Sequence, residues 1–293
     1  MNYRLVSALN CMFTSDLHGV KKKYERLFKE IKEEKPDGVF IGGDILPSGV
    51  NRGRDPEKFL ENFLSKHLQE IKDSLDKKVN IYIIMGNDDP RIYEKQLKKM
   101  ADEDILHYIH DETETFDGLH VSGYSFVPPT PFRLKDWERY DVSRFVGVGA
   151  VSPEKGTRTV EISKYEEKHT TIEDDLTELS KNSPPEKTIY LFHTPPYETD
   201  LDRADLDGKK VDHAPMDVHV GSIAVKRFIE QKEPLITLHG HVHETVEMTG
   251  NWREKIGSTL SFTGVHSGQK LALVNFDTEE PENATRTVID VES

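Results

Sequence analysis

The sequence predicts an α/β fold with a mostly parallel sheet, and three features of the chain predict it. Apolar runs typical of buried strands alternate with amphipathic helical stripes through the first half of the 293 residues. The spacing between these runs is that of strand–helix–strand units, which favour parallel strand pairing. Polar residues directly follow the strands, at the carboxyl ends where ligands collect in such sheets.

The first half of the chain is predicted to hold three strands with two helices between them. A short apolar run over 8–13 predicts the first strand, and the runs over 39–41 and 79–85 predict the next two. The first helix has apolar residues spaced i, i+3, i+4 and i+7. Its members are Tyr24, Leu27, Phe28 and Ile31. The second helix is marked by Leu60, Leu64, Leu68, Ile71 and Leu75.

The second half begins with a polar excursion over about 125–187, with one helix expected near 172–181. This segment lacks the apolar content for a core of its own, so we expect one domain over 1–293 that includes it. Strands are then predicted over 188–193, 234–240, 258–263 and 270–276, with a helix over 222–231.

Composition limits the classes of function. The formal net charge of −14 repels polyphosphate backbones, so we expect no nucleic-acid partner. Cys11 is the only cysteine, which excludes an intrachain disulfide. No apolar run approaches the length of a membrane span, and the first residues lack the pattern of a signal peptide. We therefore expect a cytoplasmic enzyme. The acidic charge does not exclude a small phosphorylated substrate, because the local field at a site can oppose the global one, and oligomeric state is left open.

A group of metal-binding residue types follows the predicted strands. The motifs that contain these residues are Asp16-x-His18, Gly43-Asp44, Gly86-Asn87, His193 and Gly240-His241-x-His243. Residues at i and i+2 of an extended chain project to the same side. Mixed carboxylate, imidazole and amide donors suit Mn, Fe, Zn, Co or Ni better than Ca or Mg. Ordinary turn chemistry would explain the Asp and Asn residues singly, but it does not explain four histidines.

The ordered motifs D-x-H, G-D, G-N-x-D, H and G-H-x-H resemble the calcineurin-like metallophosphoesterase superfamily. The resemblance runs from Asp16 to His243 and implies a four-layer α/β/β/α sandwich with two divalent metal ions at the strand ends. It also implies hydrolysis of a phosphomonoester or phosphodiester by a metal-bridging hydroxide. The ligands implied for one metal are Asp16, His18, Asp44 and His243. Those implied for the other are Asn87, His193, His241 and the bridging Asp44.

The third motif departs from the superfamily pattern G-N-H-[DE], whose histidine would assist the leaving group. Asp88 stands in the place of that histidine, and Asp89 matches the acidic residue. An aspartate has an unperturbed pKa near ~3.9, and adjacent cations lower it further. We therefore expect Asp88 to be ionised at neutral pH and unable to donate a proton.

Three interpretations of this substitution remain. The enzyme could act on diesters or on esters with good leaving groups, which need little acid catalysis. Another group could supply the proton, and His219, just before the predicted helix cap Ser222, is the candidate. The alternative function is a non-catalytic metal-binding scaffold or protein-interaction module on the same fold, which the complete ligand set argues against. A two-metal nuclease is disfavoured by the acidic charge.

Other residues carry weaker expectations. His239 is expected to be a hydrogen-bonded core residue. Five histidines in polar or helical contexts are expected at the surface: His67, His107, His110, His120 and His169. Lys21, Lys22 and Lys23 are expected to form a solvated first helical turn. Candidate contacts with phosphate or substrate are Arg52, Arg54, Arg91, Arg133, Lys135 and Trp137.

Overall fold

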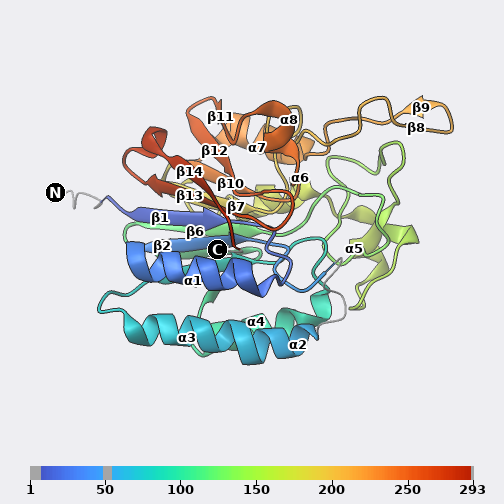
Figure 1. The fold of residues 1–293 in the computed structure, drawn as a ribbon. Helices are drawn as coiled ribbons and strands as arrows, with labels where there is room; N and C mark the ends of the chain where they lie inside the picture. The colour runs from blue at the N-terminus through green and yellow to red at the C-terminus, as the bar shows by residue number, and fades with distance from the viewer. Residues whose placement is uncertain (1–7, 49–54, 292–293) are drawn as a thin grey trace.

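The fold consists of two sheets that face each other between layers of helices (Figure 1). A computed structural model describes residues 8–48 and 55–291 of the chain. Each of the two main sheets has six strands, and a separate two-stranded hairpin projects from the body. This arrangement confirms the predicted α/β/β/α sandwich. Arg52 and Arg54 lie outside the described residues.

The first sheet has the strand order β14-β13-β1-β2-β3-β4. Its strands are β1 Asn10–Thr14, β2 Gly38–Gly42, β3 Asn80–Ile84, β4 His107–Tyr108, β13 Leu271–Asp277 and β14 Thr285–Ile289. Strands β1 to β4 are parallel, whereas β13 and β14 complete the sheet in antiparallel pairing. Thr14 pairs with Ile41, and Gly42 pairs with Ile84, so the carboxyl ends of β1, β2 and β3 meet at one edge.

The second sheet has the order β11-β12-β10-β7-β6-β5. Its strands are β5 Glu112–Phe116, β6 Leu119–Tyr124, β7 Thr188–Phe192, β10 Ile236–His239, β11 Arg253–Ile256 and β12 Thr259–Thr263. Strands β6, β7, β10 and β12 are parallel, and the edge strands β5 and β11 are antiparallel to their neighbours. The predicted parallel core is thus confirmed, with antiparallel strands added at the edges.

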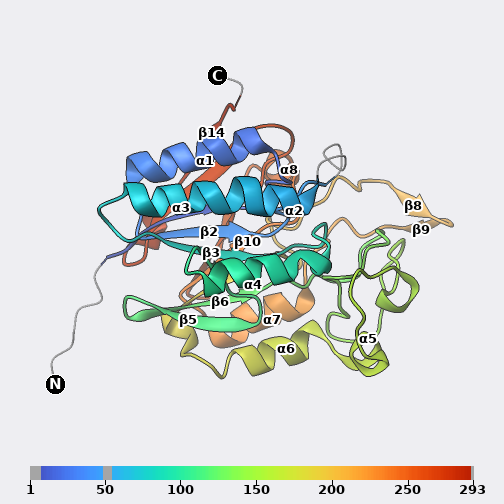
Figure 2. The same cartoon turned by 90° about the horizontal axis from the view of Figure 1, so that it is seen from below.

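Helices α1, α3 and α4 cover the outer face of the first sheet, and α6 and α7 that of the second (Figures 1 and 2). The α-helices are α1 Lys21–Glu34, α2 Pro56–Phe59, α3 Ser65–Ser74, α4 Glu94–Asp102, α5 Lys164–His169, α6 Ile172–Leu179, α7 Ile223–Lys232 and α8 Thr245–Thr249. A π-helical turn over Leu60–Leu64 joins α2 to α3. The predicted stripe of α1 is buried, which confirms that helix. No helix in the described part of the chain has the length and apolar character that a membrane span requires.

Two apolar clusters hold these layers together. One lies between the sheets and includes Phe13, Phe40 and Leu191. The other lies between the sheets and the helices that cover them, and it includes Leu27 of α1 and Ile229 of α7. Parallel strands buried on both faces are expected to read as continuous apolar runs, as these do.

The excursion is attached to loops near the carboxyl ends of the strands. The carboxylate of Asp136 accepts a hydrogen bond of 2.8 Å from the backbone N–H of Arg91. The carboxylate of Asp141 accepts hydrogen bonds from Ser222 Oγ at 2.5 Å and Ile223 N at 2.7 Å, at the start of α7. Ser222 Oγ in turn accepts from Val225 N at 3.0 Å, as expected of a helix cap.

Three expectations about individual residues in this region are wrong. Lys135 and Trp137 are fully buried, so neither is placed to contact substrate. Lys135 instead forms an ion pair with Glu138, which is itself buried. His110 is packed against Trp137, with ring centroids 4.7 Å apart, and its Nδ1 accepts from Ser125 N. His110 is therefore a half-buried member of an aromatic cluster and not the fully solvated residue that was expected.

Candidate metal centre

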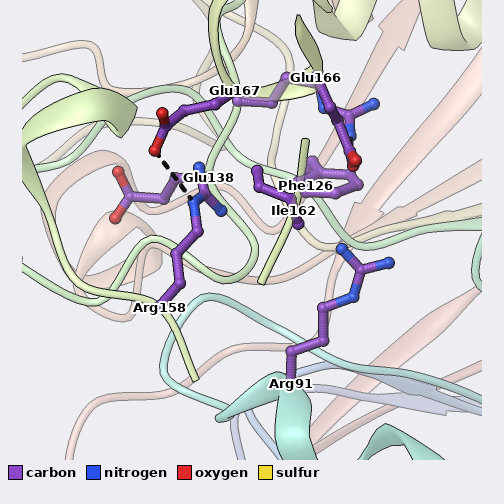
Figure 3. A pocket seen from close by; sticks show the side chains of 8 residues that line it. Arg91, Phe126, Glu138, Arg158, Ile162, Glu166 and Glu167 are labelled. Carbon is purple, nitrogen blue, oxygen red and sulfur yellow. Dashed lines mark hydrogen bonds and ion pairs between the residues drawn. The ribbon is translucent and has the colours of Figure 1, made fainter. Parts of the chain in front are cut away.

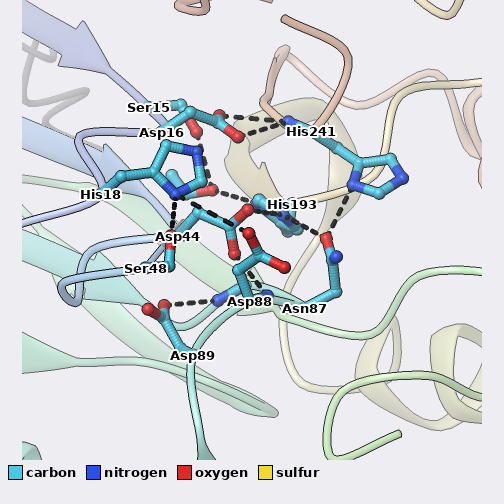
Figure 4. A network of polar contacts seen from close by, with 12 residues as sticks. Ser15, Asp16, His18, Asp44, Ser48, Asn87, Asp88, Asp89, His193 and His241 are labelled. Carbon is cyan, nitrogen blue, oxygen red and sulfur yellow. Dashed lines mark hydrogen bonds and ion pairs between the residues drawn. The ribbon is translucent and has the colours of Figure 1, made fainter. Parts of the chain in front are cut away.

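The ends of five strands bring the predicted ligands together (Figure 4). The loops after β1, β2 and β3 supply residues from the first sheet, and those after β7 and β10 supply residues from the second. One group has donor atoms that all lie within 4.8 Å of one another. Its members are Asp16, His18, Asp44 and His243.

The distances within this group suit the coordination shell of a divalent ion. His243 Nε2 lies 3.0 Å from Asp16 Oδ1 and 3.0 Å from His18 Nε2. Donor atoms about 2.1 Å from one ion at angles between 90° and 109° are separated by roughly 3.0–3.4 Å. One cation could bind the two facing imidazole nitrogens and the nearby carboxylate oxygen at the same time.

A second set of donors adjoins the first through Asp44. Asn87 Oδ1 lies 3.0 Å from His193 Nε2 and 2.7 Å from His241 Nδ1. His193 Nε2 is also 3.5 Å from Asp44 Oδ2. Asp44 therefore lies between the two sets, where a carboxylate could contact two ions. The chemistry of these donors fits a pair of borderline divalent ions.

The backbone at four of these residues adopts a conformation that side chains rarely accept. Asp16, His18, Asp44 and His241 have φ angles of +59°, +47°, +49° and +76°. Positive φ at residues other than glycine is uncommon and costs free energy, and such residues cluster at functional sites. The strands before these residues fix this backbone, which places their side chains in the two adjoining donor sets described above.

Two glycines leave the space that these donors occupy. A Cβ atom at Gly86 would lie 2.4 Å from Asp44 Oδ1 and 2.6 Å from His193 Cε1. A Cβ atom at Gly240 would lie 2.6 Å from Asp16 Oδ2. Neither glycine needs a positive φ, so the requirement at both positions is close approach.

Hydrogen bonds fix which imidazole nitrogens face the site. His193 Nδ1 lies 2.8 Å from the carbonyl oxygen of Gly42, and only an Nδ1–H group can donate there. This bond leaves Nε2 free to act as a ligand, as is usual for metal-binding histidines. His18 Nδ1 lies 2.6 Å from Ser48 Oγ, a hydroxyl that can donate or accept, and this contact holds the ring with Nε2 toward His243. Ser48 follows the G-D motif in a loop, and nothing in the sequence distinguished it from an ordinary loop serine.

The charges of the site shift pKa values in both directions. Burial by itself raises the pKa of Asp16 and Asp44, but the neighbouring imidazoles outweigh burial and lower both. Burial lowers the pKa of His193, yet the charge of Asp44 dominates and raises it to about 10. Burial and the charge of His193 lower the pKa of His241 to about 4. Because metal ions require neutral imidazoles, binding of a cation must displace protons here.

Asp88 and Asp89 have different surroundings. Asp89 is fully buried, and its carboxylate accepts hydrogen bonds from Ile45 N, Leu46 N and Gly86 N at 2.8–3.0 Å. Burial and the charge of Asp44 nevertheless raise the pKa of Asp89 to about 8. Asp88 points into the site, with Oδ2 3.9 Å from His18 Nδ1. Burial and Asp44 raise the pKa of Asp88 as well, opposite to the expected direction, whereas bound divalent ions would lower it.

A cleft of about 250 Å³ opens beside the first group of donors. Its lining includes Asp16, His18, Asp88 and His243, and also Lys23 of α1. Lys23 is only 4% exposed, so the expectation of a solvated first turn is wrong for this lysine. The sequence did carry a signal, because Lys23, Leu27 and Ile31 are four residues apart and share the buried face of α1.

A second cavity lies within the excursion, and its lining includes Arg91, Arg139 and Arg158 (Figure 3). It encloses about 10 Å³, which is room for about one water molecule. Arg91 is paired with Glu94, and Arg139 with Asp175 and Glu166. This cavity is too small and too well neutralised for a phosphorylated substrate.

His219 lies outside both donor sets. Its Nδ1 is 2.7 Å from Asp202 Oδ1, and its ring packs near Tyr197 with centroids 6.0 Å apart. Asp202 is buried and also accepts hydrogen bonds from Glu198 N, Thr199 N and Gly221 N. His239 is buried between Thr194 O and Thr237 Oγ1, which confirms its expected place in the core.

Fold and donor set together define a two-sheet α/β protein with a candidate metal centre at its strand ends. The chain belongs to the calcineurin-like phosphoesterase family, whose sequence pattern matches residues 9–245. It is accordingly a hydrolase of phosphoric ester bonds, and the resemblance inferred from the ordered motifs is confirmed.

Solved structures share this fold at low sequence identity. The protein TT1561 of Thermus thermophilus is 15% identical, with a TM-score of 0.58 over 97% of this chain and 100% of that chain. A dimetal phosphatase from Danio rerio is 13% identical, with a TM-score of 0.50 over 97% of this chain and 99% of that chain. No curated protein matches the chain. At these identities the likeness demonstrates the fold alone.

Proposed function

We propose that the chain hydrolyses a small phosphomonoester or phosphodiester with two divalent metal ions bound at the strand ends. The observation that carries this proposal is the convergence of two adjoining donor sets through Asp44. The proposed ligands of one ion are Asp16, His18, Asp44 and His243. Those of the other are Asn87, His193, His241 and Asp44. The name of the Danio rerio protein, a dimetal phosphatase, supports a pair of ions.

The role of the protein in this reaction is to position charge. Bound divalent ions supply Lewis acidity to phosphoryl oxygens and lower the pKa of water. Asp16 and Asp44 are buried carboxylates that keep such ions in the site, and Gly42 O holds His193 with Nε2 directed inward. Because the site is assembled from both sheets, its donors are fixed before substrate enters, and preorganised charge is what phosphoryl transfer requires.

The environment of Asp88 bears on the choice of substrate. Its carboxylate shares the cleft with His18 and His243, where bound divalent ions would keep it ionised and unable to protonate a leaving group. We therefore propose a preference for diesters and for esters whose leaving groups need no proton, such as aryl phosphates.

His219 is the other candidate proton donor. The carboxylate of Asp202 accepts from its Nδ1–H group, which directs Nε2 away from this pair as in many general acid–base histidines. If His219 protonates the leaving group, replacing it with Gln slows hydrolysis of alkyl esters more than that of aryl esters. Equal slowing of both would assign His219 to loop structure.

The test is an activity screen of protein loaded separately with Mn²⁺, Fe²⁺, Zn²⁺, Co²⁺ and Ni²⁺. We expect hydrolysis of aryl phosphomonoesters or diesters, and a loss of at least about 100-fold in Asp44→Asn. Asp73→Asn on the exposed side of α3 removes the same charge outside the site and serves as the control. Absence of hydrolysis with every metal, or full activity in Asp44→Asn, would refute the proposal.

A further inference from the structure

The side chain of Lys23 is a buried cation at the edge of the cleft. It is only 4% exposed, yet it forms no hydrogen bond or ion pair with any residue in 8–48 or 55–291. Most buried charges in proteins are paired, because desolvation of an isolated ammonium is costly. The aliphatic stem of a lysine can pack beside the apolar residues of α1 while its ammonium group reaches a polar cleft.

The surroundings of Lys23 favour an anionic ligand. Lys23 lines the 250 Å³ cleft together with Val20, which is the residue that precedes α1. Val20 offers no side-chain acceptor to the first turn of α1, and that turn contains no acidic residue. The amino terminus of a helix carries a partial positive charge, which attracts anions. In α1 the N–H groups of Lys23 and Tyr24 already donate to Val20 O, so the dipole and the lysine side chain supply the attraction. The helix and the lysine therefore present positive charge to one cleft.

The acidic side chains in the cleft make no direct contact with Lys23, although the charge of Asp16 partly offsets the effect of burial on the pKa of Lys23. Asp16 and Asp88 line the same cleft but form no ion pair with Lys23. Asp16 is instead hydrogen-bonded to His243 and to the backbone N–H of His241. Asp88 is nearest to His18. The ammonium group therefore has no direct hydrogen-bond or ion-pair partner among residues 8–48 and 55–291, and a ligand that enters the cleft could supply one.

We propose that the side chain of Lys23, at the positive amino terminus of α1, forms an anion subsite that binds a phosphate group of the ligand in this cleft. This inference rests on the proposed function and adds a residue that positions the substrate. The phosphate could be the one that reacts or a second phosphate on the same molecule, since the cleft is larger than one phosphate ion needs. Lys23 binds through charge and hydrogen bonds and takes no part in bond breaking.

Titration calorimetry of metal-loaded protein tests the subsite without relying on catalysis. The probes are inorganic phosphate and propane-1,3-diol bisphosphate. Lys23→Met keeps the length of the buried stem and removes the charge, and Lys23→Arg keeps the charge. Lys22→Met removes the same charge from an exposed position one residue away and is the matched control. Thermal unfolding of each variant establishes that it is folded.

We expect Lys23→Met to weaken binding about 10- to 100-fold, the range for a hydrogen bond to a charged group. Lys23→Arg and Lys22→Met should stay within about 3-fold of the unchanged protein. Weaker binding of both probes identifies the reacting phosphate as the ligand of Lys23, and weaker binding of the bisphosphate alone identifies a second phosphate. Either result supports the subsite.

Unchanged affinity of Lys23→Met for both probes would overturn the inference, as would equal weakening by Lys22→Met. A lysine with a purely structural role would change the unfolding temperature and leave both affinities unchanged. The calorimetric result does not depend on whether the protein hydrolyses esters. Phosphate binding that depends on Lys23 in a protein without esterase activity would support the subsite and refute the function.

Discussion

Replacement of Gly86 by alanine tests the close packing on which the site depends. The new Cβ would lie 2.4 Å from Asp44 Oδ1 and 2.5 Å from the backbone nitrogen of Asp44. The first contact could be relieved by moving a side chain, but the second requires a shift of backbone by about 1 Å. His193 Cε1, at 2.6 Å, blocks movement of the new methyl group in another direction.

Overpacking of this kind costs about 1–3 kcal/mol of unfolding free energy. Moving Asp44 also disturbs the residue shared by both donor sets, so the affinity for Mn²⁺ should fall at least about 10-fold. Urea unfolding and equilibrium dialysis measure the two effects. Gly147→Ala is the matched control, because its Cβ would meet nothing within 4 Å and its φ is not positive. Normal stability and normal Mn²⁺ affinity in Gly86→Ala would refute this account of the packing.

Three further predictions concern single side chains. Asp88→His should raise activity on alkyl monoesters relative to aryl esters, and an unchanged ratio measured by steady-state kinetics would remove Asp88 as the determinant. Asp89→Asn places an amide against backbone N–H groups that now meet a carboxylate, so urea unfolding should show a loss of about 3 kcal/mol; a loss below about 0.5 kcal/mol would contradict this. Burial and the charges of Arg91 and Arg139 lower the pKa of His110, so its neutral form stabilises the fold above about pH 6.5 and this contribution is lost as pH falls. The stability difference between the unchanged protein and His110→Gln should therefore shrink from pH 7.5 to 5, and a constant difference would show that His110 does not titrate.

The strands that carry the site could be predicted because each is a continuous apolar run that ends at a metal-binding residue type. Strand β3 shows the pattern most clearly, with buried residues through Ile84 followed by Gly86 and Asn87. The edge strand β5 was missed because its sequence, ETETF, is polar and mostly not buried. Such a strand is defined by pairing with its neighbour, and single-sequence periodicity does not report pairing.

Parts of the site also depend on contacts that sequence order does not reveal. Ser48 acquires its role because the loop after β2 folds back to His18. Lys23 differs from Lys22 only in which face of α1 it occupies, and the helical spacing to Leu27 was the available signal. The excursion was expected to contact substrate through Lys135 and Trp137, but both are buried because that segment braces Arg91 and the start of α7.

The central claim is that the two donor sets bind two divalent ions that share Asp44. Elemental analysis of protein dialysed against Mn²⁺ tests it directly, with Asp44→Asn and His193→Ala analysed beside the unchanged chain. We predict about two ions per chain for the unchanged protein, about one for His193→Ala and fewer than one for Asp44→Asn. One ion or none in the unchanged protein, or two ions retained in both variants, would contradict the claim.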